Sequence, residues 1–556
     1  METTNIGGEI LARPDTNANA TIRPDFDPYT GNDPYIFISY AHADNELVNY
    51  LMNKLNQERF RIWYDAGLEI GNDFREELEE RIRDCSVMIF FASEKSFASK
   101  YCSTEIIYAV KYSKKIYPFF LGEIGTVNVP SQLEMVIGNT HHIFYDHAEK
   151  SIKALVDALP KQTMRALEID YDGIVVKCKD GNNKIAIPDN FEGRKVTAIG
   201  AEAFKLCTAL EEITFGANIK SIGTGAFRSC SSLKEMLLSE SIDIVGENAF
   251  RDCISLEKLV IERNIDIFDR AFENCPMLHT VVFPDDFAEV NNAVFNSCKG
   301  LKTINLPDSV IMIGESAFAD CDNLERLDIP SGVIKINDFA FANCKLLSEV
   351  ILNTSITKIG KNAFQNCVSL KSFFVPRSIT LIENGVFKGC KTLEKIEVDP
   401  KNKYYRSFNN VLFTKNKSEL IFYPPSLPDE TYDVPDSVTR INSYAFYGCT
   451  NLKSINIPDT VKEIDEGAFY ACTNLEQIVV PDSVVRIEDY CFRNCTHLKY
   501  IEVPDSVQDI GWGLFRGCSY GIWAKEGFEL TVVCNDGTPM ARFCDERGMK
   551  RIKKQI

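Results

Sequence analysis

Along the second half of the chain, apolar residues recur with a single period. A Phe is followed three positions later by a Cys about every 23 residues, and twelve of these thirteen pairs precede a Leu by three residues. Such a fixed period predicts a solenoid, in which each repeat buries its apolar edge only against its neighbours. The pairs begin at Phe204, Phe227, Phe250, Phe272, Phe295, Phe318, Phe341, Phe364, Phe387, Phe446, Phe469, Phe492 and Phe515.

One repeat shows the elements that we expect in each. Leu452–Ile457 alternates apolar and polar residues, which is typical of a short strand with one buried side. Pro458-Asp459 predicts a turn, Val461 and Ile464 mark a second short strand, and a helical turn should end at Cys472. Each repeat therefore supplies two strands and a turn to the solenoid.

Before these repeats, short apolar runs alternate with segments in which apolar residues recur every three or four positions, as in helices. Five strands separated by helices within about 125 residues predict a doubly wound parallel sheet. Its ligands should lie beyond the carboxyl ends of the strands, near Ser39–His42, Asp65–Phe74 and Ser93–Glu105. We expect strands at 35–40, 61–65, 87–92, 116–121 and 142–145, and helices at 43–58, 74–84, 103–112 and 150–159.

These patterns divide the chain into five parts. We expect a disordered tail over 1–33, the sheet domain over 34–160, an N-terminal cap with a hairpin over 161–198, the repeats over 199–520 and a C-terminal cap over 521–556. The interval from Cys390 to Cys449 exceeds two further repeat lengths. Its alternating β-forming residues predict a hairpin insertion at about 399–433, which is either a docking feature or decoration.

The net charge and the positions of the cysteines exclude several classes of protein. The net charge of -18 argues against general nucleic-acid binding, and no apolar run is long enough to span a membrane. Without a signal-like start, we expect a cytoplasmic protein. Thirteen of the 19 cysteines are those of the recurring Phe–Cys pairs, where buried free thiols fit better than disulfides or zinc sites. His141, His142 and His147 lack matching carboxylates, so we expect solvated histidines and no metal site.

Three motifs in the first domain resemble the TIR (Toll/interleukin-1 receptor) family, over about residues 34–160. Phe37-Ile38-Ser39-Tyr40 is similar to the family's first-strand motif, and the Asp65–Phe74 loop resembles its BB loop. Ser96–Glu105 (SFASKYCSTE) resembles the stretch in which a serine, an aromatic-Cys pair and a glutamate open the third helix. The fold class expected is therefore multidomain: a flavodoxin-like α/β TIR domain followed by a β-solenoid.

The sequence pattern of the repeats is similar to that of the BspA-type leucine-rich repeat, over about residues 199–520. Strand positions between the inward-facing residues could form an apolar stripe for a protein ligand, or could pack within the layer. These positions are Leu237, Val260, Val282, Ile351, Phe374 and Val479.

In catalytic TIR members the glutamate cleaves the bond between nicotinamide and ribose of NAD+, and the resemblance gives this role to Glu105. The chemistry suits a carboxylate, because the ribosyl group becomes cationic and nicotinamide leaves without needing an acid. Tyr40, Glu69, Phe74 and Tyr101 are candidates for contacts with NAD+, which would be a substrate; no cofactor is expected.

Two functions remain open. In the first, the chain is an NAD+ glycohydrolase or ADP-ribosyl cyclase in immune or anti-phage signalling, activated by TIR self-association when the repeats bind a trigger. In the second, it is a non-catalytic TIR adaptor or virulence effector. Glu105 favours the first; Tyr101 in place of the usual Trp, and Ala41-His42 in place of a basic residue, favour the second.

Overall fold

The computed structural model describes residues 24–31, 34–66, 72–122, 127–137, 143–145, 148–160, 167–178, 183–191, 193–519 and 529–554. Contacts within the chain separate two compact units, Met1–Ala166 and Leu167–Ile556. Among the described residues, no helix combines the length and the apolar character needed to cross a bilayer.

The first unit is built on a five-stranded sheet with the order β2-β1-β3-β4-β5. All neighbouring strands are parallel, which is the flavodoxin-like doubly wound order, and this part of the predicted fold class is confirmed. The strands are β1 (Ile36–Ser39), β2 (Ile62–Trp63), β3 (Val87–Ala92), β4 (Lys115–Phe120) and β5 (Ile143–Phe144).

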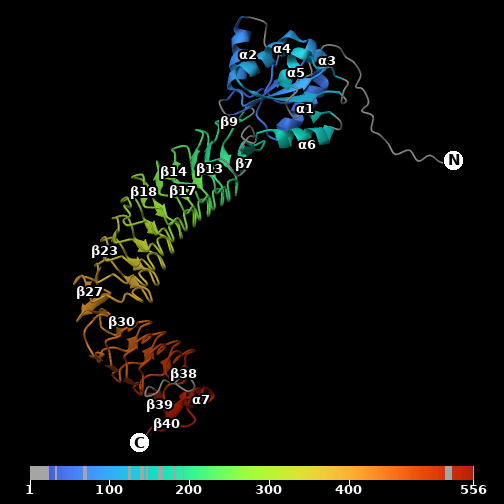
Figure 1. The fold of residues 1–556 in the computed structure, drawn as a ribbon. Coiled ribbons are helices and arrows are strands. Elements are labelled where there is room, and N and C mark those ends of the chain that lie inside the picture. Colours follow the sequence, from blue (N-terminus) through green and yellow to red (C-terminus); the bar gives the residue numbers. More distant parts are fainter. Residues whose placement is uncertain are drawn as a thin grey trace, which may run out of the picture. The chain divides into compact units, whose positions relative to one another are not determined.

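Helices cover both faces of this sheet (Figure 1). Buried residues of α1 and α6 pack on one face, and buried residues of α2, α4 and α5 pack on the other. Because each strand contacts helices on both sides, its run is apolar throughout, as in β3 with all six residues buried. The helices are η1 (His42–Asp44), α1 (Asn45–Gln57), α2 (Asn72–Asp84), α3 (Glu94–Ala98), α4 (Lys100–Lys111), α5 (Ser131–Ile137) and α6 (Ala148–Ala158).

Three expectations for this unit need correction. The third predicted helix begins at Lys100, earlier than 103, because the Ser99 hydroxyl accepts the Cys102 N–H and caps it. Helices α3 and α5 were not predicted. Residues 24–31 are not a free tail, since the Tyr29 N–H donates to the Ile62 carbonyl and the Tyr64 hydroxyl donates to the Phe26 carbonyl.

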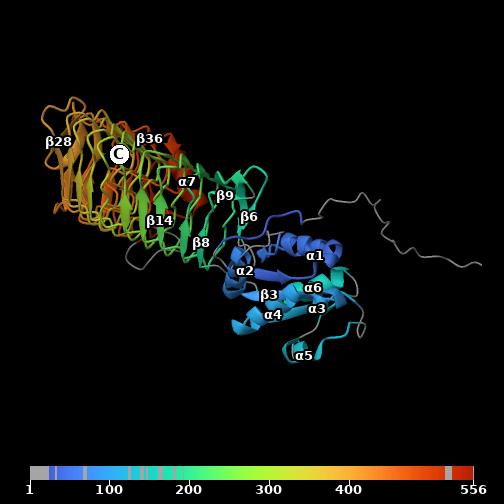
Figure 2. The ribbon, with the colours of Figure 1, turned by 90° about the horizontal axis from the view of Figure 1, so that it is seen from above.

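The second unit is a β-solenoid whose short strands run in parallel rows (Figure 2), as predicted. It opens with the antiparallel hairpin β6–β7, and β7 pairs with the first repeat strand β11. One row of strands contains β6 (Leu167–Ile169), β7 (Ile174–Cys178), β11 (Ala198–Ile199), β13 (Ser221–Ile222), β15 (Ile244–Val245), β17 (Asp266–Ile267), β19 (Glu289–Val290), β20 (Met312–Ile313), β22 (Lys335–Ile336), β24 (Lys358–Ile359), β26 (Leu381–Ile382), β32 (Arg440–Ile441), β34 (Glu463–Ile464), β36 (Arg486–Ile487) and β38 (Asp509–Ile510).

The second row carries the longer strand of each repeat. It contains β8 (Lys184–Ala186), β12 (Glu212–Thr214), β14 (Glu235–Leu238), β16 (Lys258–Ile261), β18 (Thr280–Val282), β21 (Arg326–Asp328), β23 (Glu349–Ile351), β25 (Ser372–Val375), β27 (Lys395–Val398), β31 (Thr431–Asp433), β33 (Ser454–Asn456), β35 (Gln477–Val479), β37 (Tyr500–Glu502), β39 (Thr531–Val533) and β40 (Lys550–Ile552). A small hairpin, β9 (Asn190–Phe191) and β10 (Arg194–Lys195), precedes the repeats, and α7 (Pro539–Glu546) lies in the C-terminal cap.

The predicted insertion is a three-stranded antiparallel meander. It consists of β28 (Tyr405–Phe408), β29 (Val411–Thr414) and β30 (Glu419–Phe422). Strand β30 then pairs in parallel with β32, so the row of short strands resumes beyond the insertion.

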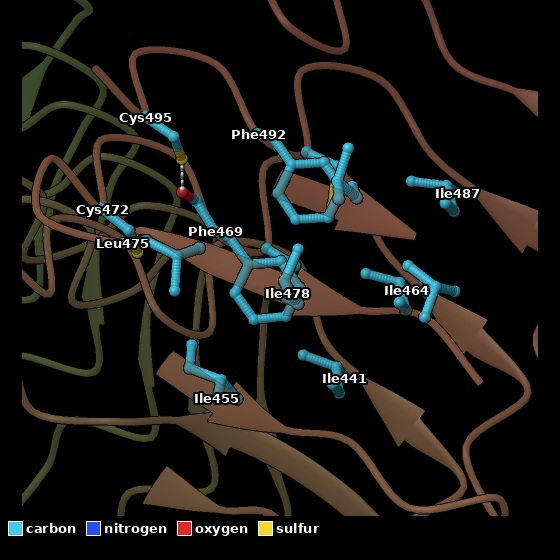
Figure 3. Packing of buried hydrophobic residues seen from close by; sticks show 14 of the residues in the cluster. Ile441, Ile455, Ile464, Phe469, Cys472, Leu475, Ile478, Ile487, Phe492 and Cys495 are labelled. Carbon is cyan, nitrogen blue, oxygen red and sulfur yellow. Dashed lines mark hydrogen bonds between the residues drawn. The ribbon is translucent and has the colours of Figure 1, made fainter. Parts of the chain in front are cut away.

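Stacked aromatic rings fill the interior of the repeats. The Phe318 and Phe341 ring centroids lie 5.5 Å apart with an interplanar angle of 5°, and Phe469 and Phe492 lie 5.3 Å apart at 3° (Figure 3). In such pairs each Phe covers the face of the next, which buries a large apolar area, whereas Phe364 and Phe387 each pack against Phe373.

Each cysteine of the repeats is a buried free thiol, as predicted. The Cys495 thiol donates to the Phe469 carbonyl at 3.1 Å (Figure 3), and Cys344 donates to Phe318 at 3.3 Å. The residue before the Cys often has positive φ, as at Asn343 (64°) and Gly389 (80°), which explains the recurrence of Asn, Asp and Gly there.

Neighbouring residues of β25 should differ sharply in their effect on stability. Phe373 is 2% exposed inside the solenoid, whereas Phe374 is 47% exposed on the other side of the strand. Phe373→Ala should lower the free energy of unfolding of the repeats by about 3–5 kcal/mol through lost burial and a cavity. Phe374→Ala should change it by less than about 1 kcal/mol. Urea unfolding of the two variants checks this, and equal losses would contradict the described packing.

Candidate functional site

The candidate site lies where the carboxyl ends of β1, β2 and β3 meet, as predicted from the parallel order. Ser39 is the last residue of β1, Asp65 follows β2, and Ser93 follows β3. The Ser93 hydroxyl donates to Asp44 at 2.6 Å, and the Lys95 ammonium lies 2.9 Å from the same carboxylate. These contacts tie the loop after β1 to the loop after β3.

Glu105 is placed by the geometry of α4. Its helix buries Cys102, Glu105, Ile106 and Ala109, which share one face at spacings of three and four residues. Glu105 therefore occupies a core-facing position that normally holds an apolar residue, and it is only 8% exposed. A buried carboxyl at such a position needs a partner or must stay protonated.

Ser39 is that partner. Its hydroxyl, fully buried at the end of β1, donates to Glu105 Oε2 at 2.5 Å. Burial raises the pKa of the Glu105 carboxyl to about 8, because the ionised form loses hydration. The Ser39 hydrogen bond opposes this shift, the nearby Asp65 charge adds to it, and His42 lowers it. Glu105 is therefore mostly protonated at neutral pH in the ligand-free protein.

A histidine–aspartate pair lies at the same edge of the sheet. His42 Nε2 is 3.6 Å from Asp65 Oδ2, and the Asp65 hydrogen bond raises the pKa of His42. The Tyr40 ring lies 5.6 Å from the His42 ring, and burial raises the pKa of Tyr40 to about 12, with Asp65 and Glu105 contributing. Tyr40 therefore stays a neutral hydroxyl close to the carboxyl group.

The structure describes the other three candidates for NAD+ contact to different extents. Tyr101 lies one turn before Glu105 in the first turn of α4 and is 54% exposed. Glu69 lies outside the described residues. Phe74 lies in the first turn of α2, but its side chain is outside the described part.

Sequence reasoning did not identify the Ser39–Glu105 bond or the His42–Asp65 pair. Both join residues from different strands and helices, so no local spacing reports them. The sequence feature that the two contacts share is that Ser39 and Asp65 each stand at the carboxyl end of a strand of a parallel sheet. Among the described residues, no group of three or more His, Cys, Asp or Glu side chains could hold a metal ion.

Two family models match the chain. One, described as the BspA type leucine rich repeat region, matches residues 181–302, 289–418 and 418–522. The other, described as the TIR domain, matches residues 36–156. A search of curated proteins returned no match.

Several solved structures resemble the repeats. A leucine rich cell surface protein from Faecalibacterium prausnitzii is 24% identical, with 68% of this chain and 94% of that chain covered and a TM-score of 0.42. A leucine-rich repeat protein from Bacteroides ovatus is also 24% identical, with 70% and 97% covered and a TM-score of 0.40. The pneumococcal vaccine antigen PcpA is 17% identical, with 68% and 96% covered and a TM-score of 0.41.

Burial of Glu105 should make the stability of the first unit fall as pH rises. Because the pKa of the folded state exceeds the ordinary value of 4.5, the folded protein holds this proton up to about pH 8. Its stabilising effect is fully present below pH 4.5 and is lost as pH rises through 8. The free energy of unfolding of Glu105→Gln, measured relative to that of the unsubstituted protein, should therefore rise by about 3 kcal/mol from pH 5 to pH 8.

Glu58→Gln is the control, since Glu58 is exposed at the end of α1, opposite the site. Urea unfolding, followed by hydrogen exchange in β3, measures the difference at each pH. A Glu105→Gln effect that does not change with pH would show that the carboxyl is not held protonated.

Proposed function

Because the chain belongs to the BspA-type leucine-rich-repeat family and carries a TIR domain, we propose that it is a TIR effector that cleaves NAD+ under the control of its repeats. The observation that carries this proposal is the buried Glu105 carboxyl, held by Ser39 at the carboxyl ends of the strands. A core-facing helix position that serves only packing would normally hold an apolar residue.

The proposed reaction breaks the bond between ribose C1′ and the nicotinamide nitrogen. Nicotinamide leaves as a neutral molecule and takes the bonding electrons, so positive charge moves to the ribosyl group. The Glu105 carboxylate stabilises that charge, and this interaction is strong because the group is shielded from water. Water then attacks C1′ and loses a proton, giving ADP-ribose, nicotinamide and H+; attack by a group of the substrate would give a cyclic product.

The raised pKa of Glu105 matches a cationic substrate. NAD+ carries a positive nicotinamide ring, and a positive charge close to a buried carboxyl favours its ionised form. Binding of the substrate would therefore release the Glu105 proton at neutral pH. Ser39 acts as a positioning residue, since its hydroxyl fixes Oε2 and favours the carboxylate.

The repeats would bind the trigger. Leu237, Val260 and Val282 are directly paired in register across β14, β16 and β18, and Leu237 and Val282 are 51% and 45% exposed. Ile351, Phe374 and Val479 are also exposed. Val260 is half-buried, whereas the exposure of the other five side chains suits contact with a protein ligand. We place the protein in the cytoplasm, where NAD+ is available, in immune or anti-phage signalling through TIR self-association.

NAD+ consumption by the full-length protein tests this proposal. The protein, clustered on a surface to promote TIR contacts, should convert NAD+ to nicotinamide, and Glu105→Gln should lower the rate at least about 100-fold by removing the charge that stabilises the ribosyl cation. Glu58→Gln should retain the rate.

Chromatography of nicotinamide and ADP-ribose products gives the readout. If the clustered protein left NAD+ intact, or if Glu105→Gln were as active as Glu58→Gln, the catalytic proposal would fail. The adaptor function would then account better for the TIR domain.

A further inference from the structure

Residues 24–31, which we call the strap, cover an open edge of the sheet in the first unit. In the strand order β2-β1-β3-β4-β5, β2 is an outer strand. The Tyr29 N–H of the strap donates to the Ile62 carbonyl of β2 at 2.8 Å. An uncovered edge strand presents backbone groups that can pair with another chain. The strap therefore protects this edge.

The strap reaches both faces of the sheet. Phe26 packs against the buried residues between the sheet and helices α1 and α6, and Tyr29 packs against those between the sheet and α2, α4 and α5. Asp25 is tied to α1, because its N–H donates to Asn53 Oδ1 at 2.9 Å and the Asn53 amide donates to its carboxylate at 2.9 Å. Asp25, Phe26 and Tyr29 thus anchor the strap.

One of these anchors is connected to the candidate functional site. The Tyr64 hydroxyl donates to the Phe26 carbonyl, and the two rings meet edge to face with centroids 5.5 Å apart. Tyr64 is only 3% exposed, and the next residue is Asp65, whose Oδ2 lies 3.6 Å from His42 Nε2. The Tyr40 ring, 5.6 Å from the His42 ring, packs against the same buried cluster. The contact of Tyr64 with the strap therefore helps to fix the position of Asp65.

The strap can leave the edge without unfolding the sheet. Pro24 and Pro28 have no N–H, so the strap cannot form a continuous ladder of backbone hydrogen bonds with β2. Its anchors Phe26 and Tyr29 are only half-buried, and Asp25 is exposed. A segment with so few buried contacts opens at a lower free energy than the central strands.

We propose that the strap is an autoinhibitory switch on the candidate site. While the strap is attached, Tyr64 is fixed and holds Asp65 beside His42. When the strap detaches, the carboxyl end of β2 is released and Asp65 moves away from its partner.

The inhibitory sign of this switch rests on the proposed NAD+ chemistry. The negative charge of Asp65 adds to the rise in the pKa of Glu105, and so helps to keep that carboxyl protonated. The proposed reaction uses the ionised carboxylate. An attached strap thus holds Glu105 in its unreactive form, and a detached strap favours the reactive one.

The switch is tested on the full-length protein without NAD+, so that its failure is distinct from failure of the proposed reaction. The readout is the titration of His42 by NMR. The hydrogen bond to Asp65 raises the pKa of His42 above the ordinary 6.5, burial opposes this, and the charges of Asp65 and Glu105 add to the rise. Tyr64→Phe keeps the ring but removes the hydroxyl that binds the strap. It should lower the His42 midpoint by at least about 0.3 pH units, because Asp65 is no longer held.

Tyr35→Phe is the matched control. The Tyr35 hydroxyl also donates to a backbone carbonyl, that of Arg81, at 2.6 Å. Tyr35 precedes β1, however, and so lies at the end of the strand opposite the site. Tyr35→Phe should leave the His42 midpoint unchanged. A midpoint that Tyr64→Phe leaves unchanged or raises, or that both variants lower equally, would overturn the proposal.

Hydrogen exchange tests whether the strap detaches on its own. In the full-length protein, the Tyr29 N–H should exchange at least about 100-fold faster than the Ile89 N–H in the middle of β3, because only the strap must open. Tyr64→Phe should speed exchange at Tyr29 further without changing exchange at Ile89. If Tyr29 exchanged as slowly as Ile89, the strap would open only when the whole sheet unfolds, and it could not act as a switch.

Discussion

Most repeats of this solenoid bury their Phe against the Phe of a neighbouring turn. Ring stacking at about 5.5 Å, as between Phe318 and Phe341, requires that successive turns keep the same conformation and register. The hydrogen bond from the Cys344 thiol to the Phe318 carbonyl, and backbone hydrogen bonds such as those from Phe339, Phe341 and Asn343 to the next turn, maintain that register. Stability is consequently a sum of contacts between nearest neighbours, and any interruption has local consequences.

The same dependence gives the insertion its importance. A full extra repeat would continue the stack, but the antiparallel meander supplies only Tyr423 in the position of a repeat Phe. The row of N–H groups at Gly385, Phe387 and Gly389 is the direct result. Within the described residues, these three N–H groups lack a backbone partner, and the Ser426 N–H, which donates to the Leu393 carbonyl, is the backbone link across the interruption.

In the TIR domain the corresponding constraint is the burial of Glu105 on the core face of α4. Among the described residues, Ser39 donates a hydrogen bond to this carboxyl, and Asp65 and His42 lie nearby. A carboxyl group in this setting stays protonated until a positive charge approaches. In the proposed reaction, the positive nicotinamide ring of NAD+ would supply that charge.

Much of the fold could be predicted because it is periodic or apolar. The spacing of Phe and Cys predicted the solenoid, and the buried run of β3 with its neighbours predicted the parallel sheet. The insertion was predicted from the interval between Cys390 and Cys449, but the free N–H row could not be, because it depends on how β30 pairs. Glu105 was found through its motif. Its burial and its bond to Ser39 arise from residues 66 positions apart and need the tertiary structure.

We propose that Glu105 is a buried, protonated carboxyl that ionises when a cationic substrate binds. An NMR titration of its side-chain carbon in the full-length protein tests this directly, with Ser39→Ala as the comparison. We predict a midpoint near pH 8 without ligand, a higher midpoint in Ser39→Ala, and a lower midpoint when NAD+ is present. A midpoint near 4.5 that neither the substitution nor NAD+ moves would contradict the account.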